Sequence, residues 1–167
     1  DASLKKGNIT HLNLKNSMLT MLPKQIQQLK KLESLDLRNN KLTILPEEIE
    51  QLNKLKILDI ASNDLAEFPK EILQLENLET LDLSLNPLSE IPSNISKLKK
   101  LKKLRLSGNY SNYGAYIDLP PEIFTLKNTL IDLKYQFKDN NLNENWLKTL
   151  KSSHFSILLN NYYLEEG

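Results

Sequence analysis

Aspartate recurs at a fixed interval in the middle of the chain. Asp36, Asp59 and Asp82 are 23 residues apart, and the same interval leads back to Asn13 and on to Arg105. A row of carboxylates can dock basic groups of a partner, and carboxylate oxygens also suit a hard cation such as Ca²⁺. A third interpretation is a solvated acidic face that binds nothing. General acid–base catalysis is not indicated, because the carboxylates come without a cleft, a histidine or a nucleophile.

Tyrosines form a second cluster, in a segment at residues 110–118. Tyr110, Tyr113 and Tyr116 are interspersed with Ser, Asn, Gly and Ala. Rigid aromatic rings on an adaptable polar frame are typical of binding loops. The alternative is that one or two of these rings pack against the neighbouring structure and simply anchor the loop.

The elements that must position both clusters belong to a 23-residue repeat, which is clearest over residues 32–109. Each unit opens with L-x-x-L-x-L, and this alternation predicts a short strand with one buried face. A later Pro, followed by Ile and Leu at three-residue spacing, predicts a short helix or 3-10 turn. A fixed period of this length predicts a solenoid. Each unit also carries an asparagine where its strand turns, and these residues are Asn40, Asn63, Asn86 and Asn109.

The residues between the leucines point away from the buried side of each predicted strand. In adjacent strands, roughly 4.8 Å apart, the three aspartates would stand in one column. Arg38 is another outward residue of the same face. We therefore predict a partner-binding surface made by Asp36, Arg38, Asp59, Asp82 and Arg105, together with Tyr110, Tyr113 and Tyr116.

These repeats resemble the leucine-rich repeat family. L-x-x-L-x-L and a downstream Pro-x-x-Ile-x-x-Leu are in register in four full units, and the match extends over residues 9–126. This form is similar to the Ras-group-type and bacterial repeats. The resemblance implies an α/β fold, a curved solenoid with a parallel β-sheet on its concave face and short helices or 3-10 turns on its convex face. It also implies that the usual role is binding another protein.

The repeat pattern divides the chain into three predicted parts. Residues 1–8 are expected to form an N-terminal helical cap, because Gly7 suits the end of a helix. Residues 9–128 would hold five leucine-rich repeats, the fifth with an inserted loop at 110–118, since its Leu-Pro pair arrives late. Residues 129–167 would form a degenerate sixth repeat and a C-terminal cap. Within that last part we expect a strand near 130–134, a helix at 143–151 and a final strand at 155–159.

Composition narrows the function classes. The chain has 167 residues, a net charge of +1 and no cysteine, so disulfides, thiolate metal sites and cysteine nucleophiles are excluded. Neither His11 nor His154 has companions at ligand spacing, and no apolar stretch is long enough to span a membrane. We expect no cofactor, no bound metal and no nucleic-acid partner.

Charge is unevenly distributed along the chain. Residues 44–90 contain eleven acidic and three basic residues, and a basic cluster follows directly. This cluster could engage an acidic partner, a membrane surface or nucleic acid, or be a solvated edge; no interleaved aromatics support nucleic acid. Its members are Lys97, Lys99, Lys100, Lys102, Lys103 and Arg105.

The sequence thus predicts a non-enzymatic, monomeric protein–protein interaction module. Two alternatives come from other classes: the recognition domain of a larger signalling or effector enzyme whose catalytic part lies outside this chain, and a surface or adhesive protein. The chain begins with Asp1 rather than Met, which indicates a processed or trimmed product. A cytoplasmic and an exported bacterial protein therefore both fit the sequence.

Overall fold

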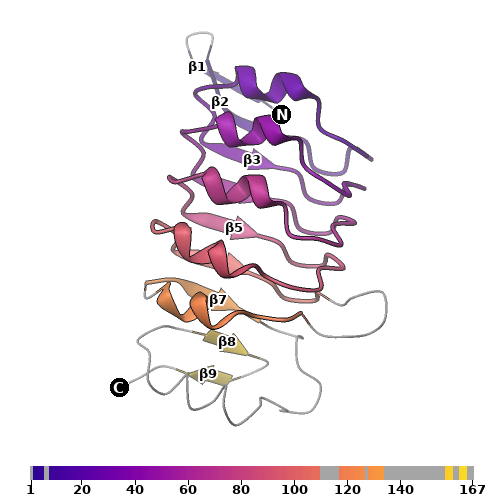
Figure 1. The fold of residues 1–167 in the computed structure, drawn as a ribbon. Helices are drawn as coiled ribbons and strands as arrows, with labels where there is room; N and C mark the ends of the chain where they lie inside the picture. Colours follow the sequence, from indigo (N-terminus) through magenta and orange to yellow (C-terminus); the bar gives the residue numbers. More distant parts are fainter. Residues whose placement is uncertain are drawn as a thin grey trace.

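The computed structural model shows a solenoid in which one sheet runs along the stack of repeats (Figure 1). It describes residues 2–5, 8–109, 117–126, 128–133, 157–159 and 162–164, with side chains for 9–109, 117–126 and 128–133. Within these residues the strands follow chain order; β2 to β8 are parallel, and β1 and β9 are antiparallel to their neighbours. The strands are β1 Ala2–Lys5, β2 Asn8–Asn13, β3 Ser34–Asp36, β4 Ile57–Asp59, β5 Thr80–Asp82, β6 Lys103–Arg105, β7 Leu130–Asp132, β8 Ile157–Leu159 and β9 Tyr162–Leu164.

Short 3-10 helices cover the other side of the sheet (Figure 1). Each begins directly after a proline whose φ lies in the range a helix start needs. In the second repeat the Ile49 amide donates to Pro46 O at 3.0 Å, and the Leu52 amide donates to Ile49 O at 3.0 Å. Bonds that close after three residues define a 3-10 helix. The helices are η1 Lys24–Gln28, η2 Glu47–Gln51, η3 Lys70–Gln74, η4 Ser93–Lys97 and η5 Pro121–Thr125.

The repeat leucines fill the space between the sheet and the 3-10 helices. The inward leucine of each regular strand and the apolar residue directly after the strand are fully buried, and one apolar cluster extends through all the described repeats. Since no unit covers its own apolar face, stability comes from the interfaces between neighbouring units. The buried residues within these strands are Leu35, Leu58, Leu81 and Leu104, and those directly after them are Leu37, Ile60, Leu83 and Leu106.

The predicted asparagines form a buried column at the ends of the strands. The Asn63 Nδ2 donates to Ile60 O of its own repeat and to Leu37 O of the preceding repeat, both at 3.0 Å. Its Oδ1 accepts from the Leu42 amide at 3.0 Å. One amide side chain therefore bonds backbone groups of two repeats. Neighbouring asparagines share the carbonyls, because Leu37 O also accepts from Asn40 and Ile60 O also accepts from Asn86.

The residue before each column position has a left-handed backbone. The φ angles are 57° at Asn16, 53° at Asn39, 55° at Ser62, 55° at Leu85 and 70° at Gly108. Asparagine and glycine tolerate this conformation, whereas leucine is disfavoured there. Leu85 nevertheless occupies the position with 59% of its surface exposed. Its Cδ2 lies so close to Gly108 that a Cβ added to the glycine would meet it at 2.6 Å.

The predicted N-terminal helix is wrong. Ala2–Lys5 is strand β1, and it pairs antiparallel with β2 in a register that places Ala2 beside Leu12 and Lys5 beside Asn8. The first repeat would otherwise end in a row of unpaired backbone groups, and a strand satisfies these where a helix cannot. The segment covers the sheet edge, as the cap interpretation requires, but with a different secondary structure.

The C-terminal part agrees with two of the three expected elements. The sixth strand is β7, Leu130–Asp132, and the last expected strand contains β8, Ile157–Leu159. The helix predicted at 143–151 lies outside the described residues. The division of the chain into cap, repeats and cap stays a prediction.

The inserted loop is shorter than predicted at its C-terminal end. Ile117 is buried, the Asp118 amide donates to Ser89 O at 2.7 Å, and the Ile91 amide donates to Asp118 O at 2.9 Å. Residues 117 and 118 therefore already belong to the stack rather than to the insertion.

We predict that Leu85→Asn stabilises the protein by about 1 kcal/mol, because Asn adopts the left-handed backbone at lower cost. Thermal unfolding would show this as a rise in Tm of roughly 2–4 °C for a chain of this size. Leu85→Ala is the matched control, since it removes the exposed side chain but keeps a Cβ in the same conformation. An equal gain in both variants would mean that exposure, not backbone strain, destabilises this position.

Candidate functional site

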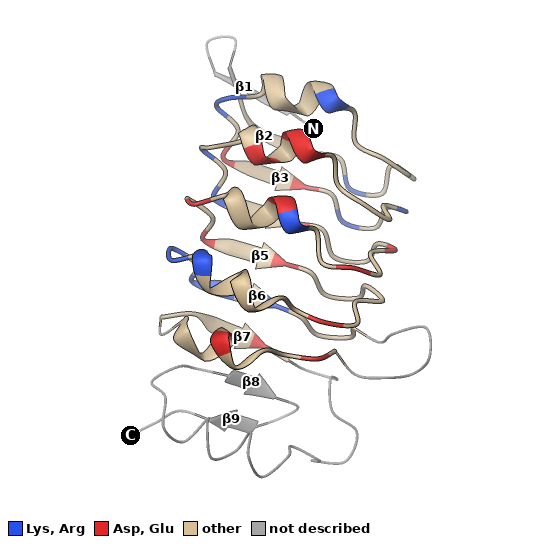
Figure 2. Cartoon of the chain, in the orientation of Figure 1, with Lys and Arg blue, Asp and Glu red and all other residues tan. Residues whose placement is uncertain are grey.

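The predicted column of polar residues is present on the sheet face. The strand register pairs Asp36 with Asp59, Asp59 with Asp82, and Asp82 with Arg105. It also places Asp132 of β7 beside Arg105. Figure 2 shows the resulting order of charge, with acidic residues at the ends of β3, β5 and β7 and basic residues on β6.

Each aspartate of the column also has a local structural role. The Oδ1 of Asp36, Asp59 and Asp82 accepts a hydrogen bond from the amide two residues ahead, at 3.1, 3.2 and 3.0 Å. Asn13 does the same at 3.1 Å. Asp and Asn favour such turns because their short side chains reach the backbone two residues on. The fold itself therefore explains part of the recurrence of aspartate.

Arg38 offsets two of the carboxylates. Its Nη2 lies 2.7 Å from Asp36 Oδ2 and its Nε lies 3.0 Å from Asp36 Oδ1, a two-point pairing. The same Nε lies 3.2 Å from Asp59 Oδ2. The pairing was detectable in the sequence, because Arg38 follows Asp36 by two residues and strand side chains have a period of two.

Arg105 offsets the third carboxylate. Its Nη1 lies 3.0 Å from Asp82 Oδ2 in the neighbouring strand. The cations are more accessible than the anions, because the side chains of Arg38 and Arg105 are 45% and 40% exposed, against 7% for Asp82. The predicted row of carboxylates therefore exists, but it is paired from within the chain and lies beneath its arginines.

The pKa values of the two neighbouring aspartates shift in opposite directions. The hydrogen bond with Arg38 holds the pKa of Asp36 below its usual value. Burial raises the pKa of Asp59 to about 6, and the negative charge of Asp82 adds to the rise. At 3.2 Å the Arg38 pairing opposes this rise, but burial and the flanking carboxylates outweigh it. The pairing with Asp36 also raises the pKa of Arg38 above its ordinary value.

The remaining residues on or beside the sheet face differ in how much of their surface solvent reaches. Ala61 and Ser84, which follow the column aspartates of their repeats by two residues, are both buried. Ile57 on β4 and Leu85 after β5 are exposed apolar side chains on or beside the sheet face. The sequence signal for Leu85 is its position, since Asn, Ser and Gly occupy the equivalent place in the other repeats.

The three tyrosines of the predicted loop lie outside the described residues. The two ends of the insertion are described. It begins after Asn109, which is fully buried in the asparagine column, and ends before the buried Ile117. Gly108, two residues before the insertion, lies directly beside the exposed Leu85.

The basic cluster is partly paired. Lys102 Nζ lies 2.6 Å from Glu79 Oε2, and Lys100 Nζ donates to Asn77 Oδ1 at 2.6 Å. An equivalent ion pair joins Lys56 and Glu33 at 2.8 Å, in the residues just before the strands. Exposed pairs of this kind contribute little stability, but they align lysines with the acidic residues of the preceding repeat.

No metal or membrane site is found in the part of the chain that the structure describes. There, no three or more His, Asp or Glu side chains converge as metal ligands would. Among the same residues, no helix has the length and apolar character needed to cross a bilayer. The cation interpretation of the aspartate column therefore gains no support.

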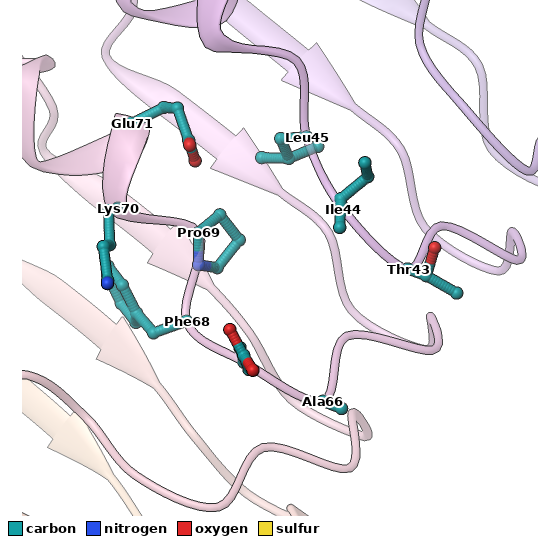
Figure 3. A pocket seen from close by; sticks show the side chains of 9 residues that line it. Thr43, Ile44, Leu45, Ala66, Phe68, Pro69, Lys70 and Glu71 are labelled. Atoms are coloured by element: carbon teal, nitrogen blue, oxygen red, sulfur yellow. The ribbon is translucent and has the colours of Figure 1, made fainter.

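A groove of about 410 Å³ lies between the second and third repeats, at the start of η3 (Figure 3). Ile44 and Phe68 contribute apolar surface, and Lys70 and Glu71 contribute opposite charges. The groove shares no residue with the aspartate column. Its lining residues do not combine a nucleophile with a histidine base, so it does not resemble a hydrolytic site.

Comparison with known proteins supports the repeat assignment. The family model described as "Leucine-rich repeat region" matches residues 47–152, and the model "Leucine rich repeat" matches residues 7–65. Among curated proteins, none matches this chain.

Several solved structures share the fold. A leucine-rich repeat protein of Leptospira interrogans is 37% identical, with a TM-score of 0.62, over 86% of this chain and 41% of its own. A plant ice-binding protein is 28% identical, with a TM-score of 0.65, over 81% of this chain and 44% of its own. The repeat ectodomain of the Arabidopsis thaliana membrane receptor kinase GASSHO1/SCHENGEN3, solved in complex with Casparian strip integrity factor 2, is 28% identical, with a TM-score of 0.56, over 69% of this chain and 14% of its own. This chain thus spans less than half the length of each.

The opposite pKa shifts predict opposite effects of two matched substitutions. At about pH 7.5, Asp59→Asn should raise the free energy of unfolding by up to roughly 2–3 kcal/mol, because the folded state holds the Asp59 charge at a cost. Asp36→Asn should lower it, since the folded state favours that charge. Chemical unfolding at about pH 7.5 and pH 4.5 measures both.

The sign of the pH dependence follows from the same shifts. The contribution of Asp59 is fully present below its unfolded-state pKa and is lost as pH rises through about 6. The contribution of Asp36 is present at neutral pH and is lost as pH falls through its lowered folded-state pKa. The gain from Asp59→Asn should therefore shrink on acidification, and a loss of stability in this variant at neutral pH would contradict the account.

Proposed function

Because this chain belongs to the leucine-rich repeat family, whose domains are in general non-enzymatic interaction modules, we propose that it binds another protein. The proposed contact surface combines the concave sheet face with the insertion that carries Tyr110, Tyr113 and Tyr116. On the sheet, the proposed contacts are Asp36, Arg38, Asp59, Asp82 and Arg105.

The observation that carries the proposal is the exposure of Leu85 in a strained conformation beside the insertion. A left-handed leucine costs stability, and an exposed one gains no burial in return. Strain of this kind persists where function requires it. Leu85 lies against Gly108, which precedes the first residue of the insertion by two positions. The strand-end edge of the sheet thus places an apolar anchor beside the residues that directly precede the tyrosine segment in the chain.

A rigid sheet supports such a surface. Cross-repeat hydrogen bonds continue beyond the strands, as at the equivalent positions Leu37 and Leu83, whose amides donate to Asp59 O at 2.7 Å and Arg105 O at 2.9 Å. Side chains held on a fixed sheet lose little entropy on binding. The related receptor ectodomain was solved in complex with Casparian strip integrity factor 2, so a similar solenoid does accommodate a partner. The plant ice-binding protein has the same sequence identity to this chain, so the fold alone does not name the ligand.

Capture of a partner by the immobilised chain, followed by affinity measurement, tests the proposal. Replacing all three tyrosines with alanine should weaken binding at least about tenfold, because buried aromatic anchors dominate interfaces. Leu85→Asn should weaken the same interaction while leaving the fold intact. The control is Met21→Ala, which truncates an exposed side chain outside the strand columns.

Unfolding curves of each variant separate lost binding from lost structure. Affinity that stays the same in the tyrosine and Leu85 variants, or that falls equally in the Met21 control, would exclude this edge as the contact surface.

A further inference from the structure

The carboxylates of the sheet face are already engaged. Asp36 and Asp59 pair with Arg38, and Asp82 pairs with Arg105. Their Oδ1 atoms also accept backbone amides. An incoming basic group would have to replace bonds that the protein makes for itself, so it would gain little.

The arginines of the same face remain accessible. A guanidinium has five N–H donors, and Arg105 uses its Nη1 for Asp82. The side chains of Arg38 and Arg105 are 45% and 40% exposed, whereas those of Asp36 and Asp59 are 18% and 19% exposed. Lys15 and Lys103 add two further cations to the outward positions of the sheet. The charges nearest to solvent on this face are therefore positive, although acidic and basic residues alternate along it.

We propose that the concave sheet face binds an extended acidic segment of a protein partner, with partner carboxylates on Arg38 and Arg105. The inference rests on the proposed binding function and adds the chemistry of the partner.

The spacing of the two arginines fits an extended chain. Arg105 is at the aspartate-column position of β6, whereas Arg38 lies two residues beyond that position in the repeat of β3. Their Cα atoms are therefore three strand spacings apart across the sheet and two residues apart along the strands, or roughly 16 Å in all. Side chains four residues apart in an extended peptide point the same way and are about 13 Å apart. Both arginine side chains lean toward the strands between them, Arg38 to Asp59 and Arg105 to Asp82. Two acidic residues in an i, i+4 arrangement can therefore reach both arginines from a peptide that crosses the strands at an angle. Planar carboxylates also match the fork of a guanidinium.

The residues between the arginines disfavour a nucleic acid. Asp59 and Asp82 occupy the two strands between β3 and β6. A nucleic-acid backbone carries a charge at every nucleotide, so it would place phosphates over these carboxylates. A peptide with small polar residues between its two acidic residues avoids that repulsion.

Synthetic probes test the proposal directly. The first is an extended peptide with two glutamates separated by three small polar residues, the second has lysines in place of the glutamates, and the third is oligothymidylate. We expect the glutamate peptide to bind best, to bind more weakly at high salt, and to lose at least about tenfold in affinity to an Arg38→Gln/Arg105→Gln variant. Lys70→Gln/Lys97→Gln is the control, because it removes two exposed cations from the 3-10 helices.

Removing Arg38 leaves two carboxylates without their partner, so Arg105→Gln alone serves as a second variant with a milder effect on folding. Tighter binding of the lysine peptide or the oligonucleotide, an equal loss in the control, or no binding of the glutamate peptide would overturn the inference. Protein binding through the sheet and insertion is judged separately, by the capture experiment with the tyrosine and Leu85 variants.

Discussion

Hydrogen bonds from the buried asparagine column are the interaction on which the stack depends. Each Nδ2 donates to carbonyls of two successive repeats, as Asn86 does to Leu83 O at 3.1 Å and Ile60 O at 3.0 Å. Apolar packing between units is not directional, whereas these bonds fix where each strand turns relative to the previous one. The strand register, the left-handed residue before each asparagine and the aspartate column all follow from that turn.

The column also shows where the stack is interrupted. At its N-terminal end Ser17 replaces the asparagine, and the Ser17 amide donates instead to Asn40 Oδ1 at 3.1 Å. At the other end, Asn109 donates to Leu83 O and Leu106 O, but within the described residues its buried Oδ1 has no hydrogen-bond partner. The insertion begins after this asparagine. Within the described residues, the regular bonding pattern of the column therefore changes at the position that precedes the insertion.

Periodicity made most of the architecture predictable. The 23-residue interval placed the strands, the 3-10 turns, the buried leucines and the aspartate register correctly, because each depends on contacts that recur from repeat to repeat. The N-terminal strand was not predicted, since Ala2–Lys5 is determined by pairing with the open edge of β2 and not by its own sequence pattern.

The chemistry of the sheet face was less predictable. The 23-residue period of the aspartates predicted an acidic sheet face. In the structure, Arg38 and Arg105 form ion pairs with these carboxylates and neutralise their charge. The raised pKa of Asp59 depends on burial, which periodicity does not report. The left-handed backbone and the exposure of Leu85 were likewise visible only in the structure. The sequence did show that Leu85 directly precedes an asparagine of the column, as Asn, Ser or Gly does in the other repeats.

The free energy of unfolding of an Asn63→Leu variant tests the central role of the column most directly. Leucine has the same branched shape and number of side-chain heavy atoms, but it leaves the buried Leu42 amide without its acceptor. It also removes one of the two side-chain donors that the carbonyls of Leu37 and Ile60 each receive. The account predicts a loss above about 3 kcal/mol, while Asn53→Leu at an exposed position stays within about 0.5 kcal/mol of the wild type. Similar stability of the two variants would contradict it and would mean that leucine packing alone holds the solenoid together.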